Sequence, residues 1–191
     1  IYISLVEAVI GNACLNALYK PISANDDNSI SSILSATKKS YKKVALFYFL
    51  ASTILAAVLP LVVHSSMSYL TLFLIVFLRG LGGTIVFFFE STVRQLLIAD
   101  GRHFYKELIH VICYGVSSAI EIALIIITKN PLMVEIAYVV SALIGLVLYY
   151  FLFKKKYKNI SLKAKPDYNA INDKKYFLIH QIHNHYLVIL H

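Results

Sequence analysis

One basic side chain lies in the middle of a long apolar run, and its type and position suggest chemistry more clearly than those of any other residue. The run extends from Tyr69 to Glu90 and is 22 residues long. At about 1.5 Å per residue, a helix of this length crosses a hydrocarbon core of roughly 30 Å. Arg79 therefore lies near the middle of a predicted transmembrane helix, where a guanidinium costs at least about 2.5 to 3.5 kcal/mol. We expect it to face a protein interior or a water-filled cavity.

Two roles are open for Arg79. A guanidinium can hold phosphate oxygens through paired hydrogen bonds, so Arg79 could bind a diphosphate or an acidic sugar in a substrate cavity. Alternatively, it forms a structural ion pair with Glu121 or Glu90. Glu121 lies inside a second apolar run, where a carboxylate either neutralises the arginine or holds a proton or Na⁺. Glu135 lies nearer the end of its own run, so we expect it to be solvated.

Three glycines follow Arg79 within four residues: Gly80, Gly82 and Gly83. They either weaken the helix at this point, as in a hinge, or allow a neighbouring helix to approach closely. Elsewhere the sequence lacks a Gly-rich phosphate loop, a nucleophile elbow and a paired-carboxylate motif. The three histidines within 180–185 have no cysteine or carboxylate to complete a metal site. We therefore expect no catalytic residue, no metal and no cofactor.

Composition indicates a membrane protein. Hydrophobic residues make up 59% of the sequence and charged residues only 15%, so a water-soluble domain could not cover its apolar surface. We expect an all-α, polytopic membrane helix bundle over residues 1–153, with the start of a further, truncated span at 186–191. The five complete spans are expected at residues 1–19, 44–63, 69–90, 108–128 and 132–153.

Two basic segments between these runs carry apolar residues at helical spacing. In residues 20–43, the apolar side chains fall on one face, opposite the lysines; in residues 154–185, apolar residues recur in the same way. We expect each segment to form an amphipathic helix on the membrane surface, with residues 154–185 acting as a linker between two lobes. The apolar positions are Ile30, Ile33, Leu34 and Tyr41 in the first segment and Ile171, Leu178, Ile179 and Ile182 in the second.

The distribution of basic residues predicts an orientation in the membrane. Segments 20–43, 94–107 and 154–185 hold five, three and eight of the 18 Lys and Arg residues. With five alternating spans these segments lie on one side, which the positive-inside rule places in the cytoplasm. This account of the net charge of +8 needs no nucleic-acid partner. The same segments can contact anionic membrane lipids, at about 1 kcal/mol per basic residue.

Several short motifs resemble those of a known family. The segment LYKP at 18–21, followed by Asp26, ISSIL at 30–34 and KKSYKK at 38–43, resembles the stretch after the second helix of bacterial polysaccharide flippases. LLIADGRHFY at 96–105 is similar to their loop after the fourth helix, with Gly101 where that pattern has glutamine. KKKYKNI at 154–160 and DKKYFLIHQI at 173–182 resemble the linker between their two lobes. The residues that match the first two motifs are Tyr19, Lys20, Pro21, Asp26, Ala99, Asp100, Arg102 and Tyr105.

The flippases in question belong to the multidrug, oligosaccharidyl-lipid and polysaccharide exporter superfamily. The resemblance implies that the chain covers the second to sixth helices of an N-terminal lobe, without the first helix or the second lobe. It also implies transport of undecaprenyl-diphosphate-linked oligosaccharide across the bacterial inner membrane by alternating access, for surface polysaccharides such as lipopolysaccharide, without covalent chemistry. The alternatives are a membrane-bound enzyme of lipid or glycan assembly and a drug exporter of the same superfamily.

Overall fold

The chain folds into a bundle of long helices. The computed structural model describes residues 2–63 and 67–171, and these residues form no β-strand. The expectation of an all-α fold is therefore confirmed for this part of the chain. The elements in order are α1 (Tyr2–Ser23), α2 (Asp27–Val62), α3 (Tyr69–Ile85), the π-helical turn η1 (Val86–Glu90), α4 (Ser91–Ala99), α5 (His103–Thr128) and α6 (Pro131–Lys156).

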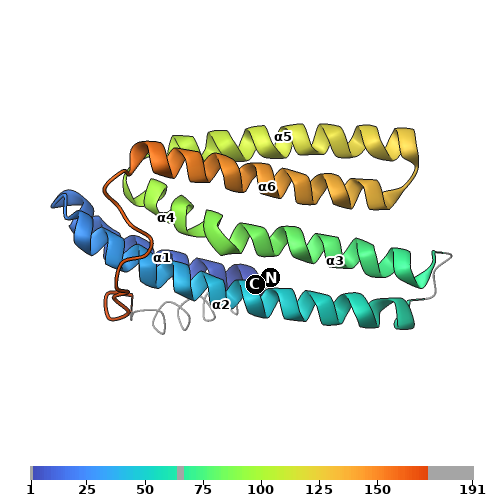
Figure 1. Ribbon diagram of the computed structural model, residues 1–191, viewed down its shortest axis with the longest axis horizontal. Helices are drawn as coiled ribbons and strands as arrows, with labels where there is room; N and C mark the ends of the chain where they lie inside the picture. The colour runs from blue at the N-terminus through green and yellow to red at the C-terminus, as the bar shows by residue number, and fades with distance from the viewer. Residues whose placement is uncertain (1, 64–66, 172–191) are drawn as a thin grey trace, which may run out of the picture.

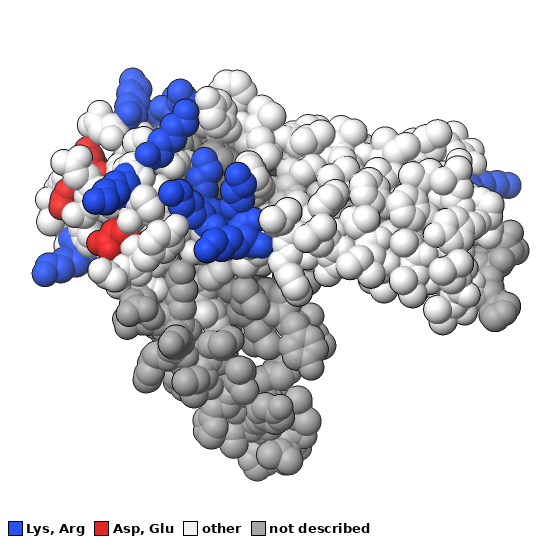
Figure 2. Space-filling model, turned by 60° about the horizontal axis from the view of Figure 1, so that its bottom comes forward, with Lys and Arg blue, Asp and Glu red and all other residues white. Residues whose placement is uncertain are grey.

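The helices run roughly along one axis (Figure 1). α3 packs between α2 and α6, α5 covers α6 on its other side, and α1 lies beside the first half of α2. The α1–α2 turn, the α4–α5 turn and the C-terminal end of α6 lie toward the same end of the bundle, which we call the basic end (Figure 1). Figure 2 shows Lys and Arg side chains gathered over that half of the molecule, while the opposite half is largely uncharged.

Four of the helices are long and apolar enough to cross a membrane: α2, α3 as far as Phe88, α5 and α6. Large apolar side chains are exposed along them, including Phe47 and Ile127, which are 71% and 77% exposed. A surface of this kind suits lipid tails and would be unfavourable in water. Of the predicted first span, residues 2–19 lie in α1, which is not among the four, and residues 186–191 lie outside the described part. A fifth span and the start of a sixth therefore stay predictions.

α2 differs from the expectation at its N-terminal half. The predicted surface helix and the next span form one uninterrupted 36-residue helix, because no glycine or proline separates them before Pro60. Asp26 caps its start by accepting hydrogen bonds from the Asn28 and Ser29 backbone amides, each at 3.1 Å. The apolar face that includes Leu34 is buried against α1 and α4. In the structure this face contacts protein, where the sequence suggested a membrane surface.

Residues 157–171 leave α6 and cross over the first turns of α2 (Figure 1). Ser35 Oγ donates to the Ala164 carbonyl at 2.7 Å, and the Ser161 amide donates to Ser31 Oγ at 3.0 Å. Ile171 is buried in the core that α1, α2, α4 and α6 share. The expected second surface helix is thus absent over 157–171, and the rest of it lies outside the described residues.

Candidate functional site: a polar pocket among apolar helices

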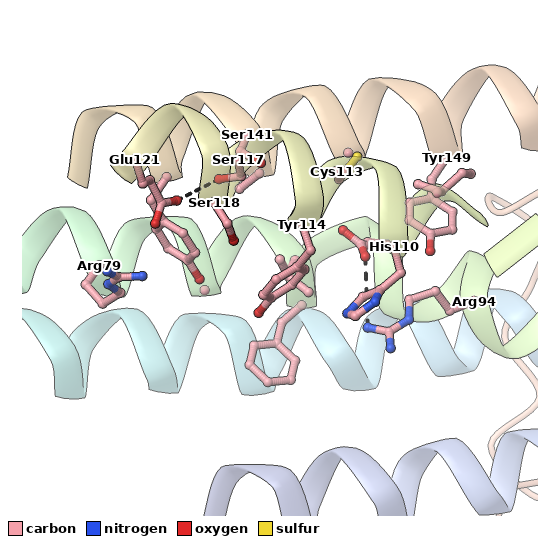
Figure 3. Close-up of a pocket in the computed structure, with 18 residues that line it drawn as sticks. Arg79, Arg94, His110, Cys113, Tyr114, Ser117, Ser118, Glu121, Ser141 and Tyr149 are labelled. Atoms are coloured by element: carbon pink, nitrogen blue, oxygen red, sulfur yellow. Dashed lines mark hydrogen bonds and ion pairs between the residues drawn. The ribbon is translucent and has the colours of Figure 1, made fainter. Parts of the chain in front are cut away.

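A pocket of about 290 Å³ lies between α3–α4 on one side and α5 and α6 on the other. Each of these elements contributes a stripe of pocket residues at spacings of three or four, which places them on one helical face. Its polar and aromatic lining includes Arg79, Glu90 and Arg94 from α3 to α4, His110, Cys113, Tyr114, Ser117 and Glu121 from α5, and Tyr138 and Tyr149 from α6. Figure 3 shows the α5 side chains pointing toward α3 and α4.

Arg79 lies at one end of this pocket and has two partners on α6. Its Nη2 donates a hydrogen bond of 2.9 Å to Oε1 of Glu135, and its guanidinium carbon lies 4.2 Å from the centre of the Tyr138 ring. The Arg79 side chain is 50% exposed, and that of Glu135 only 10%. An acidic partner and an aromatic face together shield a charge that would be unfavourable among lipid tails. Arg79 thus faces polar and aromatic protein groups, and its role in a substrate cavity stays a prediction.

The acidic partner differs from the two carboxylates that the sequence suggested. α3 packs directly on α6, which brings Glu135 to Arg79, whereas α5 packs on the other side of α6. Glu121 faces the same pocket but accepts a hydrogen bond of 2.6 Å from Ser117 Oγ. Glu90 lies 3.9 Å from Arg94. Glu135 was expected to be solvated because it lies near the start of its helix, yet it is buried.

The other end of the pocket holds a second group of polar side chains. Arg94 and Glu90 come from α4 and η1, and the His110 ring lies 4.6 Å from that of Tyr114, centre to centre. Tyr149 closes this end; it is 1% exposed, and its hydroxyl donates to the Lys106 carbonyl at 3.4 Å. In Figure 3 the labelled residues form a continuous polar track from Arg79 to Arg94.

A π-helical turn interrupts the wall of the pocket between its two ends. In η1 the Ser91 amide donates to the Val86 carbonyl, five residues back, so one extra residue is inserted between α3 and α4. Such turns are rare and often occur at functional sites. Here the turn carries Glu90, and both Val86 and Phe87 line the pocket.

The three glycines after Arg79 lie at close helix contacts. A Cβ on Gly80 would collide with Ser52 of α2, and a Cβ on Gly82 would collide with the Tyr138 ring of α6. A Cβ on Gly83 would lie 2.7 Å from the Tyr48 ring. All three positions therefore serve the packing of α3 between α2 and α6, one of the two roles that the sequence left open.

The motif residues of the basic end lie apart from the pocket. Asp100 accepts a hydrogen bond of 2.7 Å from Tyr157 and lies 2.9 Å from Arg102 Nε, so the α4–α5 turn is tied to the end of α6. Burial and the bond to Asp100 raise the pKa of Tyr157. Gly101 adopts a φ of 69°, a left-handed conformation that glycine accepts without strain.

The remaining motif residues also have structural surroundings. Tyr105 packs against the core and lies under Lys156, whose Nζ is 4.9 Å from the ring centre. Ala99 is buried there too, while Tyr19 and Lys20 are exposed. Pro21 lies inside the last turn of α1, and hydrogen bonds from Ser29 lower the pKa of Asp26. The structure thus gathers both motifs at one end but does not place them in the pocket.

The fold and pocket together define a helical protein with four helices suited to a membrane and a polar pocket among three of them. Searches with this chain against family models, curated proteins and solved structures found no match. Within the described residues, no group of three or more His, Cys, Asp and Glu side chains is placed to hold a metal ion. The histidines within 180–185 lie outside that part.

The pocket could have been found more completely from the sequence. His110, Tyr114, Ser117, Ser118 and Glu121 recur at spacings of three and four in an apolar run, which is a polar stripe on one helical face. This periodicity comes from mostly uncharged side chains, so it does not stand out as a single charge in an apolar run does. The role of Glu135 has no such signal, because it depends on which helix packs against α3.

The two native cysteines allow a direct test of pocket access. Cys113 lines the pocket and is partly exposed, whereas Cys14 is buried in the core of the basic end. In detergent, a small charged thiol reagent should modify Cys113 at least about ten times faster than Cys14, since a buried thiol is both inaccessible and poorly ionised. Mass spectrometry of each cysteine peptide over time gives the two rates. Equal rates would show that the pocket is closed to water.

Proposed function

We propose that the chain forms one lobe of a flippase that carries undecaprenyl-diphosphate-linked oligosaccharide across the bacterial inner membrane by alternating access. One observation carries this proposal: a half-exposed guanidinium, Arg79, lines a polar pocket among helices that are otherwise apolar. Charges in such positions commonly mark substrate pathways. The motifs of the basic end support the same family, although they support it through sequence resemblance alone.

The pocket suits part of such a substrate. Its volume of about 290 Å³ is at the lower limit for drug-sized ligands and far too small for an oligosaccharide. We therefore assign it to the diphosphate, with Arg79 as the group that binds phosphate oxygens and the tyrosines beside it as contacts for the nearest sugar. The sugars would occupy space between this lobe and a second one. The basic end would lie in the cytoplasm, near anionic lipid headgroups.

One observation favours a different transported molecule. The pocket holds three carboxylates, Glu121, Glu90 and, beside its rim, Glu135, against the two guanidiniums of Arg79 and Arg94. This excess of carboxylates over guanidiniums would suit a lipophilic cation, as in the drug-exporting branch of the same superfamily. The enzyme alternative has less support, because the acidic groups Asp26 and Asp100 at the basic end already have structural partners.

Protection of Cys113 distinguishes the two transported molecules. In lipid nanodiscs, undecaprenyl diphosphate should slow thiol modification of Cys113 by at least about fivefold, because a bound diphosphate fills the space beside it. Tetraphenylphosphonium should have little effect. The Arg79→Ala variant should lose the protection while keeping its helical circular dichroism spectrum. Protection by the cation and not by the lipid would favour the exporter, and protection by neither would reject both assignments.

A further inference from the structure

The contact between Arg79 and Glu135 leaves polar atoms on both side chains unused. Nη2 of Arg79 donates to Oε1 of Glu135, but Oε2 is buried and has no hydrogen-bond partner among the described residues. The guanidinium has five N–H donors in total, and half of the Arg79 side chain remains exposed. An arginine held by a single carboxylate oxygen keeps the capacity to bind a phosphate through two further bonds.

The charges around this contact oppose a second anion. Glu121 of α5 faces Arg79 across the pocket, so two carboxylates already surround one guanidinium. The other titratable groups here are the hydroxyls of Tyr138, Tyr114 and Tyr48, from α6, α5 and α2. In a low-dielectric interior, a phosphate added to this group would increase an existing excess of negative charge. A phosphate can therefore bind well only if one carboxylate is neutralised or withdrawn.

We propose that Glu135 is a displaceable counter-ion, which holds Arg79 while the pocket is empty and gives way to a phosphate group of the ligand. This inference rests on the proposed function. On displacement, the phosphate oxygens accept the hydrogen bonds of Arg79, and the carboxylate of Glu135 takes up one proton, which the buffer acid in the surrounding solution supplies. No covalent bond within the ligand or the protein side chains is made or broken except that O–H bond.

The same arrangement selects between the two ligand groups that the sequence left open for Arg79. A sugar carboxylate has the same charge and shape as the Glu135 side chain, and Glu135 has the advantage of being held on the same protein. A diphosphate carries more negative charge and offers paired oxygens, so it can replace the single bond from Nη2 to Oε1. Glu135 thus makes the site selective for phosphate over carboxylate.

The test measures binding of inorganic pyrophosphate to the whole chain in lipid nanodiscs by titration calorimetry. Glu135→Gln should bind pyrophosphate about tenfold more tightly than the wild type, because the competing charge is gone and the side-chain shape is kept. Glu121→Gln is the matched control: it also removes a negative charge, but it frees no hydrogen-bond donor of Arg79, so its gain in affinity should be smaller, at less than about threefold. Arg79→Gln should abolish binding, and glucuronate should not bind the wild type.

Proton uptake gives an independent reading. Calorimetry in two buffers of different ionisation enthalpy counts the protons bound with pyrophosphate, and Glu135→Gln should bind about one fewer than the wild type. If the variant unfolds, Glu135→Asp, whose shorter side chain cannot hold Arg79 equally well, should also bind more tightly.

The outcomes separate this inference from the proposed function. Three results would overturn the counter-ion role alone, provided that pyrophosphate binding depends on Arg79. Glu135→Gln could bind pyrophosphate no more tightly than the wild type, Glu135→Gln could bind it more weakly, or Glu121→Gln could gain as much affinity as Glu135→Gln. Absence of pyrophosphate binding in both the wild type and Glu135→Gln would overturn the phosphate site itself.

Discussion

Replacing Arg79 by alanine should destabilise the chain more than replacing Arg79 and Glu135 together. In Arg79→Ala the Glu135 carboxylate stays buried without its counter-charge. Removing one member of a buried ion pair costs about 3 to 5 kcal/mol, and the half-exposed position of Arg79 points to the lower part of that range. Glu135→Ala in the same chain removes the stranded charge, so the double variant should recover most of the loss. Unfolding free energies in mixed micelles, measured as a double-mutant cycle, give the coupling.

The control for this prediction is an ion pair of the same length in water. Arg102 Nε lies 2.9 Å from Asp100 at the basic end, and the Arg102 side chain is 41% exposed. Arg102→Ala should cost at most about 1 kcal/mol, because solvent screens an exposed pair. A loss in Arg79→Ala no larger than that in Arg102→Ala, or additive losses in the double variant, would show that Glu135 is solvated after all.

Length and hydropathy predict the helices of this chain well, because a run of apolar residues fixes a membrane helix locally. The all-α class and four of the spans follow from such runs. The start of α2 does not: residues 27–43 have the pattern of a surface helix, but an amphipathic face can be buried against protein as easily as against lipid. Of the two neighbours that bury it, α1 directly precedes α2, but α4 is distant in sequence, and the pattern of residues 27–43 does not indicate either contact.

The candidate site shows the same division between local and tertiary information. Arg79 is identifiable from one charge in one apolar run, since the penalty for exposing it to lipid applies wherever the helix packs. The identity of its acidic partner depends on how the helices pack in the tertiary structure. Glu121 is nearer the middle of its span than Glu135 is, but the layer order α3, α6, α5 decides the pairing in favour of Glu135. The π-helical turn at η1 likewise has no clear sequence signal.

Two glycine-to-alanine substitutions, one in α3 and one in α5, should have effects of opposite sign. Gly82 lies against the Tyr138 ring, so a methyl group there must push α3 away from α6 or displace that ring from Arg79. Overpacking of this kind costs about 1 to 3 kcal/mol. Gly115 lies in the middle of α5 with no atom of another residue near its missing side chain. There, alanine should stabilise the chain by about 0.5 to 1 kcal/mol, because it restricts the unfolded backbone.

The Tyr138 contact also predicts how the damage can be repaired. Gly82→Ala combined with Tyr138→Ala should be less destabilised than the sum of the two single variants, because the smaller side chain gives the new methyl group room. Thermal unfolding of the four proteins in one detergent provides the comparison. Tyr138→Ala should also weaken pyrophosphate binding, since the Tyr138 ring packs on the guanidinium face of Arg79. If Gly82→Ala and Gly115→Ala shift the unfolding temperature alike, then α3 and α6 are farther apart than the structure places them, and the pairing of Arg79 with Glu135 loses its basis.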